Sequence, residues 1–550
     1  MRDGHVLAAV QEERICRIKH SGGFPWSSIN KVLNISRISP SEIDIVAVGA
    51  TCPELLIHIP QKISRSTTFL NPLKSRKDFY KIYFFEHYRL LRAKFSLIEK
   101  LDASLSNFML RQALKKLKIH GTVYRIDHHT CHAASAFYSS GFRKCLVITA
   151  DARGDGISST VSIADERGIQ RLSSSPESAS MGHFYGGVTE VLGFRYASDE
   201  GKTEALSAFG SYSDAYEKLG AYVYVDEIAL QGHMAPYQRL ISAPFSRLLK
   251  NFKREDLAYA AQTILEKTFC ELTRRAVEAT SISCIALAGG IFLNVKLNKK
   301  IMELSSVKDV FIHPAAGDHG IPTGAGFTIY NELYGLKPRR WEHVFLGNEY
   351  REEEVRSILI RNNCKFDFIE EIGAYVGEEL LPKGKIVGWF QGRMEYGPRA
   401  LGARSILADP RRVNLLKKIR VTIKKRPNFQ PFCPSMLKET ERKYVFNPKK
   451  VDSSFMIIAF DAKQRMINEA PAVVFVDTST RIQTVKKEHN KQFYDTMKSF
   501  AKVSGTPILL NTSFNKSGEP IVCTPSQALH DFRTSGLDSV VIGNFLLSKK

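Results

Sequence analysis

Short apolar runs bounded by turn residues recur along the chain. A run of four to eight such residues is typical of a buried strand, whereas a longer periodic stretch favours a helix. On this basis we expect strands at Val6 to Val10, at Leu146 to Ile148 and at Ile386 to Phe390. Helices are expected after Ser27 or Ser28, at Asp256 to Ala276 and at Glu352 to Leu359. The pattern therefore indicates a chain that contains both kinds of element.

One strand leads directly into a pair of glycines. The run from Cys284 to Ala288 is followed by Gly289, Gly290 and a helix that carries Asn294. Backbone amides at a Gly-Gly turn and at a helix N-terminus can cradle a phosphate or a ribose. The same turn is common where a helix only packs on a strand, so the spacing leaves both interpretations open.

Two histidines at helical spacing precede a strand that ends in a carboxylate. On a helix, His128 and His132 lie one turn apart on the same face, which lets two imidazoles reach one metal ion. Asp151 ends the next strand and is followed by the turn Gly154-Asp155-Gly156. Oxygen and nitrogen donors suit iron, manganese or zinc better than a soft metal. A pair of structural histidines remains the alternative.

The stretch from Lys385 to Arg411 combines glycines with arginines. Its apolar start breaks into a loop that contains Gly392, Gly397 and Gly402, with Arg393, Arg399 and Arg404 between and after them. Arginine forks match phosphate or carboxylate oxygens two at a time, and glycine lets backbone N–H groups approach the same anion. We therefore expect an anion site in this loop, with an ordinary Gly/Arg-rich surface turn as the alternative.

Length and composition favour a multidomain protein without a membrane span. A chain of 550 residues is too long for one core. The segment from Gly335 to Arg340 reads as a linker, so we expect domains at 1–340 and 341–550. No apolar run approaches the ~20 residues that span a bilayer, and the nine cysteines show no CxxC pair. We expect a cytoplasmic protein with reduced thiols.

The formal charge of +22 raises the question of nucleic acid. The basic residues are spread along the chain, and no RNA-binding signature accompanies them. Two polyanionic small substrates account for the charge as well, so nucleic acid is not the favoured partner.

Six blocks of the sequence resemble the O-carbamoyltransferases of the NodU/CmcH type. They are KIVGWFQGRMEYGPRALGARSILADPR (385–411), IKKRPNFQPFCPSML (423–437), LLNTSFNKSGEPIVCTP (509–525), DHHTCHAASAFYSSGF (127–142), LAGGIFLNVKLNKKI (287–301) and PAAGDHG (314–320). Together they extend over almost the whole chain. The resemblance implies an α/β protein with an actin/sugar-kinase-like (ASKHA) domain at 1–340 and a YrdC-like domain at 341–550.

The resemblance also implies an activity. A member of this family would use ATP to move a carbamoyl group from carbamoyl phosphate, through a carbamoyl adenylate, to a hydroxyl of a small-molecule acceptor in biosynthesis or secondary metabolism. A divalent metal, iron foremost, would be a cofactor, and Mg²⁺ would accompany ATP. A homodimer is compatible with the family. The acceptor is not identified by the sequence.

The family motifs assign site residues in both domains. The implied metal ligands are His128, His132, Asp151 and Asp318. In the second domain, Lys424 and Arg426 form a KxR element that works with Arg399 as the catalytic set, and Ser513 with Asn515 forms an SxN element. The implied contacts to nucleotide and carbamoyl phosphate are Arg393, Arg481, Ser513, Asn515, Gly154, Asp155, Gly289, Gly290 and Asn294.

The sequence departs from the family pattern in ways that keep other functions open. The family places a further strand with a His/Asp/Ser phosphate loop before the start of this sequence, so we expect the first domain to lack its first strand. Pro427, Gln430 and Phe475 replace a glutamate, an arginine and a histidine. The alternatives are an enzyme of the tRNA threonylcarbamoyl type, since it shares both folds, and a non-catalytic nucleotide-binding descendant.

Overall fold

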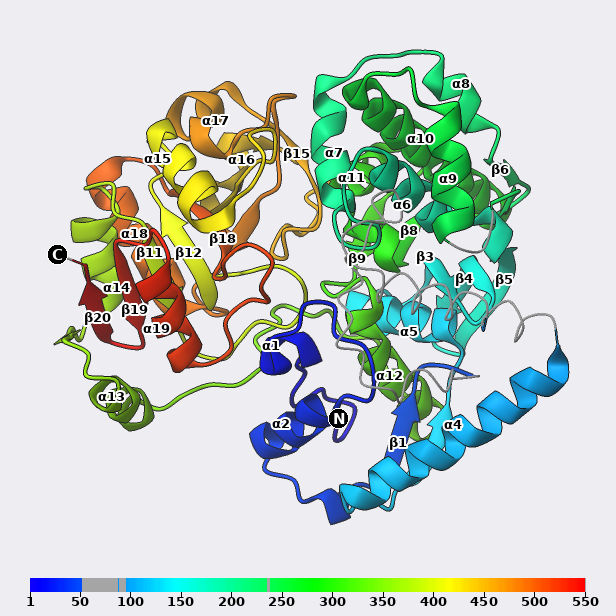
Figure 1. Ribbon diagram of the computed structural model, residues 1–550, viewed down its shortest axis with the longest axis horizontal. Helices are drawn as coiled ribbons and strands as arrows, with labels where there is room; N and C mark the ends of the chain where they lie inside the picture. The colour runs from blue at the N-terminus through cyan, green and yellow to red at the C-terminus, as the bar shows by residue number, and fades with distance from the viewer. Residues whose placement is uncertain (52–87, 89–94, 235–237, 550) are drawn as a thin grey trace. The chain divides into compact units, whose positions relative to one another are not determined.

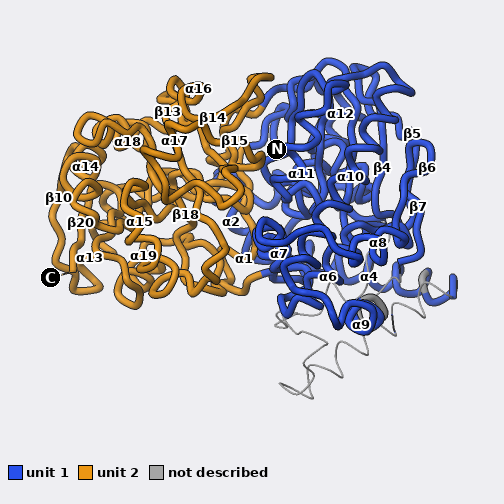
Figure 2. Tube along the Cα trace, turned by 90° about the horizontal axis from the view of Figure 1, so that it is seen from above, with its two compact units in different colours: residues 1–6, 20–340 blue, residues 7–19, 341–550 orange. Residues whose placement is uncertain are grey.

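The computed structural model describes residues 1–51, 88, 95–234 and 238–549, and the chain divides into two compact units (Figure 2). Unit 1 contains Met1–Val6 and His20–Arg340, and unit 2 contains Leu7–Lys19 and Trp341–Lys550. The main division thus falls at the expected linker. Residues 7–19 differ from the expectation, because they pack with unit 2 although the rest of the N-terminal region belongs to unit 1.

Unit 1 is built on a five-stranded sheet in the order β5-β4-β3-β8-β9 (Figure 1). The strands are β3 (Cys145–Gly154), β4 (Ile157–Asp165), β5 (Gly168–Pro176), β8 (Cys284–Ala288) and β9 (Asp309–Ile312). Strands β3, β8 and β9 run parallel, while β4 and β5 are antiparallel to their neighbours. The residues from Leu146 to Ile148 and from Ile285 to Ala288 are completely buried, as expected for strands that are covered on both faces.

Helices cover this sheet. Helix α5 (His128–Ser140) contacts β3 and β8 and packs on α12 (Ile321–Tyr334), and α6 (Met181–Val191) and α10 (Arg254–Thr280) also contact β3. Figure 1 shows α5 and α12 on one side of the sheet and α6 and α10 on the other. The remaining helices and strands of unit 1 are α2 (Trp26–Ser36), α4 (Ser96–Lys116), α7 (Glu200–Leu206), α8 (Ala215–Gly220), α9 (Gln238–Leu248), α11 (Val295–Glu303), β1 (Ile45–Val48), β2 (Thr122–Arg125), β6 (Val223–Asp226) and β7 (Ala229–Gly232).

The expected strand at Val6 to Val10 does not form. Instead this segment runs without a strand partner into α1 (Glu12–Cys16), and its backbone N–H at Ala9 donates to the carbonyl of Leu346. The helix expected after Ser27 or Ser28 is α2, which begins slightly earlier, at Trp26. The stretch from Ser39 to Asn107 is rich in Phe, Tyr, Lys and Arg, a composition that predicts mixed helix and loop, and most of it lies outside the described residues.

Unit 2 is built on an eight-stranded mixed sheet in the order β10-β20-β19-β11-β12-β18-β13-β17. Its strands are β10 (Asp367–Phe368), β11 (Val387–Phe390), β12 (Arg404–Ala408), β13 (Cys433–Leu437), β17 (Gln483–Val485), β18 (Ile508–Ser513), β19 (Ser539–Ile542) and β20 (Phe545–Ser548). A smaller sheet contains β14 (Val445–Phe446), β15 (Phe460–Ala462) and β16 (Ser479–Thr480). Besides α1, the described α-helices of this unit are α13 (Glu352–Arg361), α14 (Ile372–Tyr375), α15 (Val413–Lys418), α16 (Glu441–Tyr444), α17 (Gln464–Glu469), α18 (Lys491–Ser504) and α19 (Pro525–Thr534).

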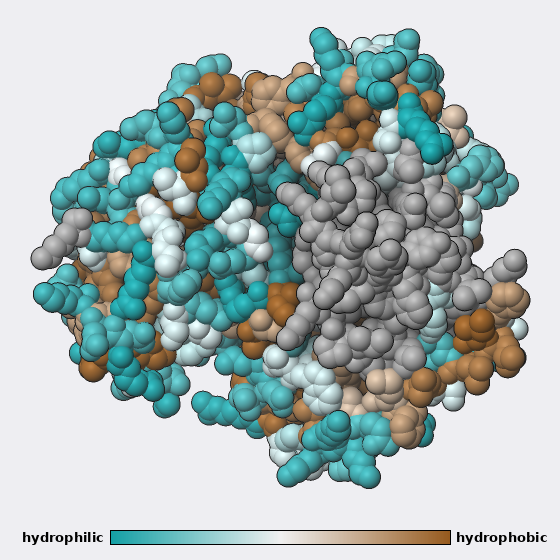
Figure 3. All heavy atoms as spheres, viewed as in Figure 1, coloured by the Kyte–Doolittle hydropathy of each residue, from teal (hydrophilic) through white to brown (hydrophobic). Residues whose placement is uncertain are grey.

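Several large apolar side chains reach the surface on helix α4. Leu97, Leu101, Leu105 and Phe108 are exposed on α4, and Figure 3 shows hydrophobic residues gathered over this element. Across the described part of the chain, no helix combines the length and the apolar composition that a bilayer span requires.

Candidate functional site

Helix α5 presents two histidines toward the end of β3. Asp127 caps the helix by accepting a hydrogen bond from the Thr130 N–H (2.8 Å), so His128 is the first residue of the helix. His132 then follows one turn later on the same face. The close approach of α5 to β3 requires Gly154, since a Cβ at that position would lie 2.1 Å from the His128 ring. The expected HxxxH helix is therefore confirmed.

The four predicted metal ligands converge. One donor atom from each of His128, His132, Asp151 and Asp318 lies within 4.8 Å of every other. The Nε2 atom of His132 is 3.2 Å from Asp151 Oδ2 and 4.0 Å from Asp318 Oδ1, and His128 Nε2 is 3.8 Å from Asp318 Oδ1. These distances suit four ligands around one ion better than direct hydrogen bonds.

The donor chemistry also fits a metal. His132 is completely buried, and its Nδ1 has no hydrogen-bond partner within the described residues, while its Nε2 faces only the carboxylates of Asp151 and Asp318. A buried imidazole without partners is costly unless something binds it. Two neutral imidazoles and two carboxylates form a donor set that suits a divalent first-row metal.

The strand ends around Asp151 hold its carboxylate in place. Asp151 Oδ2 accepts a hydrogen bond from the N–H of Gly290 (3.0 Å), and Oδ1 accepts one from Ala152 (2.7 Å). Gly289 permits this approach, because its φ of 108° is left-handed and a Cβ would lie 2.0 Å from the Ala150 carbonyl. Burial opposes the charge of Asp151, but the His132 imidazole and the Gly290 N–H hold its pKa below the ordinary value. The Gly-Gly turn thus fixes a carboxylate that is predicted to bind the metal.

The remaining predicted cradle residues have internal partners in this structure. Asp155 accepts hydrogen bonds from the backbone N–H groups of His128 (2.9 Å) and Thr51 (3.2 Å). Asn294 caps α11 through Leu297 N–H (2.9 Å) and bonds to Gln262 (2.8 Å). Their contact with a nucleotide, like that of the glycines, stays a prediction.

His129 faces away from the metal ligands. Its two ring nitrogens contact Thr149 Oγ1 (2.7 Å) and the Ile157 carbonyl (3.0 Å). Burial lowers its pKa to about 3. His129 is therefore a neutral core histidine that joins α5 to the sheet.

In unit 2 the KxR and SxN elements come together. Lys424 ends the helical turn Ile419–Lys424, and Lys425 reverses the chain with a left-handed φ of 43°. The Nζ of Lys424 donates to the Ser513 carbonyl, Ser513 Oγ (3.1 Å), the Asn515 carbonyl (3.0 Å) and Asn515 Oδ1 (2.8 Å). Burial, followed by the charge of Arg426, lowers the pKa of Lys424 well below its ordinary value.

Arg426, whose charge acts on this lysine, belongs to a group of arginines. Arg426 and Arg420 lie 5.5 and 5.8 Å from the centre of the buried Phe432 ring. Burial, together with the charges of Arg481 and Arg420, lowers the pKa of Arg426 to about 10. Within the described part of the chain, neither Arg420 nor Arg426 has a carboxylate at ion-pair distance, and Arg420 Nε is buried without a hydrogen bond. Positive groups gathered in this way are stabilised by an anion.

Arg481 completes the group at the start of β17. Its Nε donates to Cys433 Sγ (3.1 Å), which orients the guanidinium toward the beginning of β13. Sequence reasoning did not identify Arg420, although its position one helical turn before Lys424 was a usable signal.

The loop between β11 and β12 differs from the expected anion site. Its amides bind an internal carboxylate, because Glu395 Oε1 accepts hydrogen bonds from the N–H groups of Leu401 (2.8 Å), Ala403 (3.2 Å) and Arg404 (3.1 Å). Glu395 is completely buried. The loop amides that were expected to bind an anionic ligand therefore bind the Glu395 carboxylate and stabilise the loop.

Two of the loop arginines are also structural. Arg404 is completely buried and donates to the carbonyls of Gln391 (2.7 Å) and Asn348 (3.0 Å), while its guanidinium stacks on Phe390 at 3.7 Å. Arg393 donates to the carbonyls of Leu7, Leu346 and Gly347. This corrects the view of both as open forks, because backbone carbonyls accept hydrogen bonds from each guanidinium. Arg399 is half-buried on the same loop, and its predicted role stays a prediction.

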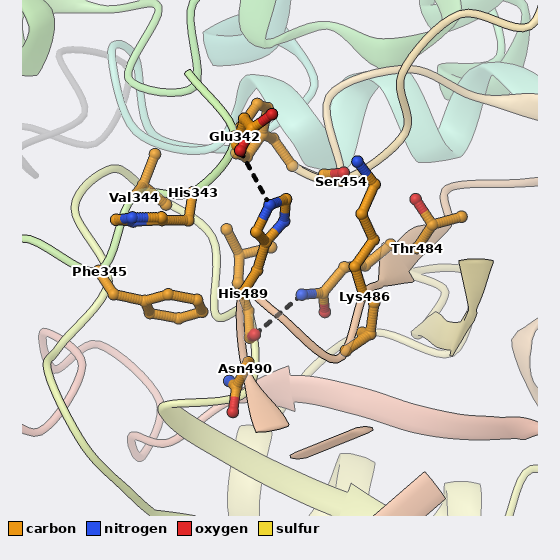
Figure 4. A pocket seen from close by; sticks show the side chains of 13 residues that line it. Glu342, His343, Val344, Phe345, Ser454, Thr484, Lys486, His489 and Asn490 are labelled. Carbon is orange, nitrogen blue, oxygen red and sulfur yellow. Dashed lines mark hydrogen bonds and ion pairs between the residues drawn. The ribbon is translucent and has the colours of Figure 1, made fainter. Parts of the chain in front are cut away.

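A small pocket of unit 2 borders this loop (Figure 4). At its rim His489 Nε2 lies 3.3 Å from Glu342 Oε2. Gln483 and Asn490 donate to the carbonyls of Leu401 (2.8 Å) and Gly402 (3.2 Å), so the pocket wall also fixes the loop. None of the predicted site residues lines this pocket.

Comparison with known proteins identifies the family of both units. The family models described as "Carbamoyltransferase N-terminus" and "Carbamoyltransferase C-terminus" match residues 1–327 and 378–549. Nodulation protein NolNO of Sinorhizobium fredii is 32% identical over 566 aligned positions, which cover 100% of this chain and 78% of that protein. The 3'-hydroxymethylcephem-O-carbamoyltransferase of Amycolatopsis lactamdurans is 28% identical over 63% of this chain and 64% of that protein.

Among solved structures, full-length HypF in its phosphate- and nucleotide-bound form matches 41% of this chain and 38% of its own, with a TM-score of 0.31 and 17% identity. That score is too low to assign a shared fold. The family models, in contrast, cover most of the chain, and the main division between the units falls in the segment 328–377 between them. The chain therefore belongs to the carbamoyltransferase family, and it is an enzyme of the NodU/CmcH type.

Proposed function

We propose that this enzyme is an ATP-dependent O-carbamoyltransferase with two sites, one in each unit. In this proposal unit 2 is a YrdC-like domain that activates the carbamoyl group, and unit 1 is an ASKHA domain that transfers it to an acceptor hydroxyl. The observation that carries the proposal is the Lys424 site, where the KxR and SxN elements meet beside Arg426 and Arg420, for which the described residues offer no carboxylate at ion-pair distance.

Activation in unit 2 would convert carbamoyl phosphate, water and ATP to carbamoyl adenylate, phosphate and pyrophosphate. Carbamate, released from carbamoyl phosphate with inorganic phosphate, would attack the α-phosphorus of ATP through an oxygen, and the bond to the pyrophosphate group would break. Negative charge grows on the departing pyrophosphate. Lys424, Arg426, Arg420 and Arg481 would stabilise that charge because they are already gathered and partly desolvated before the substrate binds.

Transfer in unit 1 would join the carbamoyl carbon to an acceptor oxygen, with AMP as the leaving group and the hydroxyl proton released. His128, His132, Asp151 and Asp318 would hold one divalent metal ion, with iron as the preferred candidate. Such an ion supplies Lewis-acid polarisation of a carbonyl or phosphoryl oxygen. The chain's own contribution is to fix the ligands through the Asp127 cap, the Gly154 contact and the Gly290 N–H.

The relatives support the chemical class of the acceptor. The name of the Amycolatopsis relative specifies a hydroxymethyl oxygen as its carbamoylated group. We therefore propose an alcohol of a small natural product or sugar as the acceptor, rather than an amine or a nucleic acid.

The test is isotope exchange between labelled pyrophosphate and ATP in the purified full-length protein. We expect exchange that requires carbamoyl phosphate, because formation of an adenylate is reversible. Exchange that proceeds equally well without carbamoyl phosphate, or the absence of any exchange, would contradict the proposed activation step. If exchange depended instead on threonine and bicarbonate, the tRNA-modifying alternative would replace this proposal.

A further inference from the structure

The segment Leu7–Lys19, here called the strap, makes contacts close to the Lys424 site of unit 2. We propose that the strap is an integral part of the activation site and that Arg17 is a positioning residue, which fixes the amide of Asn515 against Lys424. This inference deepens the proposed function of unit 2 and rests on it. Family membership alone does not predict this role. The strap lies in the part of the chain that matches the N-terminal family model, whereas Lys424 and Asn515 lie in the part that matches the C-terminal one.

The strap is seated firmly on unit 2. Arg393 donates to the Leu7 carbonyl (2.9 Å), and the Ala9 N–H donates to the Leu346 carbonyl (3.1 Å). Arg14 is almost completely buried, with 1% of its surface exposed, and donates to the Gly397 carbonyl at 2.6 Å. A buried guanidinium cannot leave its site without a large loss of favourable contacts. The strap therefore offers a fixed platform to the residues that follow Arg14.

Arg17 extends from this platform to the loop that follows β18. It caps α1 with a left-handed φ of 63°, and its own N–H returns to the Glu13 carbonyl. Its guanidinium then donates to the Ile521 carbonyl (2.8 Å) and to Glu519 Oε2 (3.2 Å). Two donors on one rigid fork fix both the backbone and a side chain of the loop.

The loop in turn orients Asn515. The Nδ2 of Asn515 donates to the carbonyls of Glu519 (2.6 Å) and Lys516 (3.0 Å). The opposite end of the amide, Oδ1, therefore faces Ser513 Oγ (2.6 Å) and Lys424 Nζ (2.8 Å). If the Glu519 carbonyl moved, the Asn515 amide would lose a hydrogen bond that fixes its orientation.

A continuous series of contacts thus links the strap to the lysine. It runs from Arg17 through Glu519 and Asn515 to Lys424, and every step is a hydrogen bond. On the far side, Lys516 Nζ donates to Thr534 Oγ1 of α19 (3.1 Å), so the loop is held from two directions. Removal of Arg17 would release one of them and leave Lys424 with a mobile partner.

The test is a double-mutant cycle on the full-length enzyme, with carbamoyl phosphate-dependent pyrophosphate release as the readout. We expect Arg17→Ala to lower kcat/KM at least 10-fold, mainly through a higher KM for ATP. Arg17→Lys should recover part of the loss, because one of the two acceptors stays within reach. Arg412→Ala is the matched control, since Arg412 also donates to a carbonyl, that of Pro382, and pairs with a carboxylate, that of Asp409.

The cycle pairs Arg17→Ala with Asn515→Ala. If Arg17 acts through Asn515, the double variant should be no worse than Asn515→Ala alone, because the contact has already been lost. Losses that multiply would overturn the inference, as would an Arg17→Ala enzyme that behaves like the Arg412→Ala control.

Hydrogen exchange separates this inference from the proposed function. Amides of residues 515–522 should exchange at least several-fold faster in Arg17→Ala than in wild type or in Arg412→Ala, whether or not any activity is present. Unchanged exchange there would refute the positioning role. Faster exchange in a protein that releases no pyrophosphate would uphold the contact and reject the proposed reaction.

Discussion

Lys424 is surrounded by neutral oxygens rather than by carboxylates. Ser513 and Asn515 accept its protons, and the nearest charged neighbours include Arg426. Its hydrogen-bond partners carry no charge, and the carboxylate of Asp531 offsets only part of the effect of burial on its pKa, so a triphosphate can supply further negative charge. Lys425, the next residue, is exposed to solvent.

We predict that Lys424→Ala lowers kcat/KM for pyrophosphate release at least ~100-fold, which corresponds to about 2.7 kcal/mol of lost transition-state stabilisation. Lys425→Ala should stay within a few-fold of wild type and serves as the control for general loss of positive charge. Steady-state kinetics at matched ionic strength decide the matter. Equal effects from the two substitutions would mean that Lys424 acts only through its contribution to the positive charge of the protein.

The residues of this site differ in how far the sequence predicted them. Short sequence motifs contain Lys424, Asn515 and the histidines of α5, so the motifs identify these residues. Arg14 was missed because its partner lies far away in sequence, since its contact with Gly397 joins positions 383 residues apart, whereas Glu395 was missed because the loop amides that it binds were assigned to a ligand. A motif records which residues are present but not which distant backbone groups they bind.

At the scale of elements, α5 is a helix whose face is set by its cap and by a glycine. These features direct His128 and His132 toward Asp151 of β3 and toward Asp318. The sequence predicted this helix and β3 correctly, since both have strong local patterns. It failed at Val6 to Val10, where the backbone groups bind Leu346 and Arg393 instead of a neighbouring strand.

We predict that the purified protein holds roughly one divalent metal ion per chain and that His132→Ala loses it, since a four-ligand site rarely survives removal of a central ligand. His120→Ala, at an exposed position, should keep the metal. Elemental analysis of both variants gives the answer. Pyrophosphate release should persist in His132→Ala, which guards against general unfolding. Full metal content in that variant would disprove the ligand assignment.

The loop between β11 and β12 is organised by one buried carboxylate. Glu395 binds three loop amides and offsets the charges of Arg404 and Arg14. Its removal would take an opposing charge away from two buried guanidinium groups, although Arg14 would keep Glu13, and the loss of a buried charge partner typically costs about 3–5 kcal/mol.

We therefore predict that Glu395→Ala lowers the free energy of unfolding by about 3–5 kcal/mol. Glu353→Ala, on the exposed side of α13, should change it by less than about 0.5 kcal/mol. Chemical denaturation followed by circular dichroism measures both. A Glu395→Ala protein as stable as the control would show that the loop does not depend on this carboxylate.

At the scale of the whole molecule, the chain passes between the two units three times. It leaves unit 1 after Val6, returns at His20 and crosses again at Arg340. The sequence showed only the last of these crossings, because the linker there has a recognisable composition, whereas the strap resembles the rest of the N-terminal region. Unit 2 is therefore discontinuous in sequence.

This discontinuity predicts a difference between two fragments. Residues 341–550 alone should have a lower Tm and weaker pyrophosphate release than the same fragment preceded by residues 7–19 and a flexible linker, since only the second retains Arg14 and Arg17. Thermal unfolding and kinetics of the two fragments provide the comparison. Identical behaviour would indicate that the strap is dispensable for unit 2.

The central claim is that both units serve a single carbamoyl transfer to a hydroxyl group, and its most direct test is made in the producing organism. Metabolites of a deletion strain are compared by mass spectrometry with those of strains that carry wild type, Lys424→Ala or His132→Ala. We predict that deletion replaces at least one metabolite by a form lighter by one carbamoyl group, and that wild type restores it while neither variant does. Restoration by either variant, or no metabolite that differs by a carbamoyl group, would contradict the account.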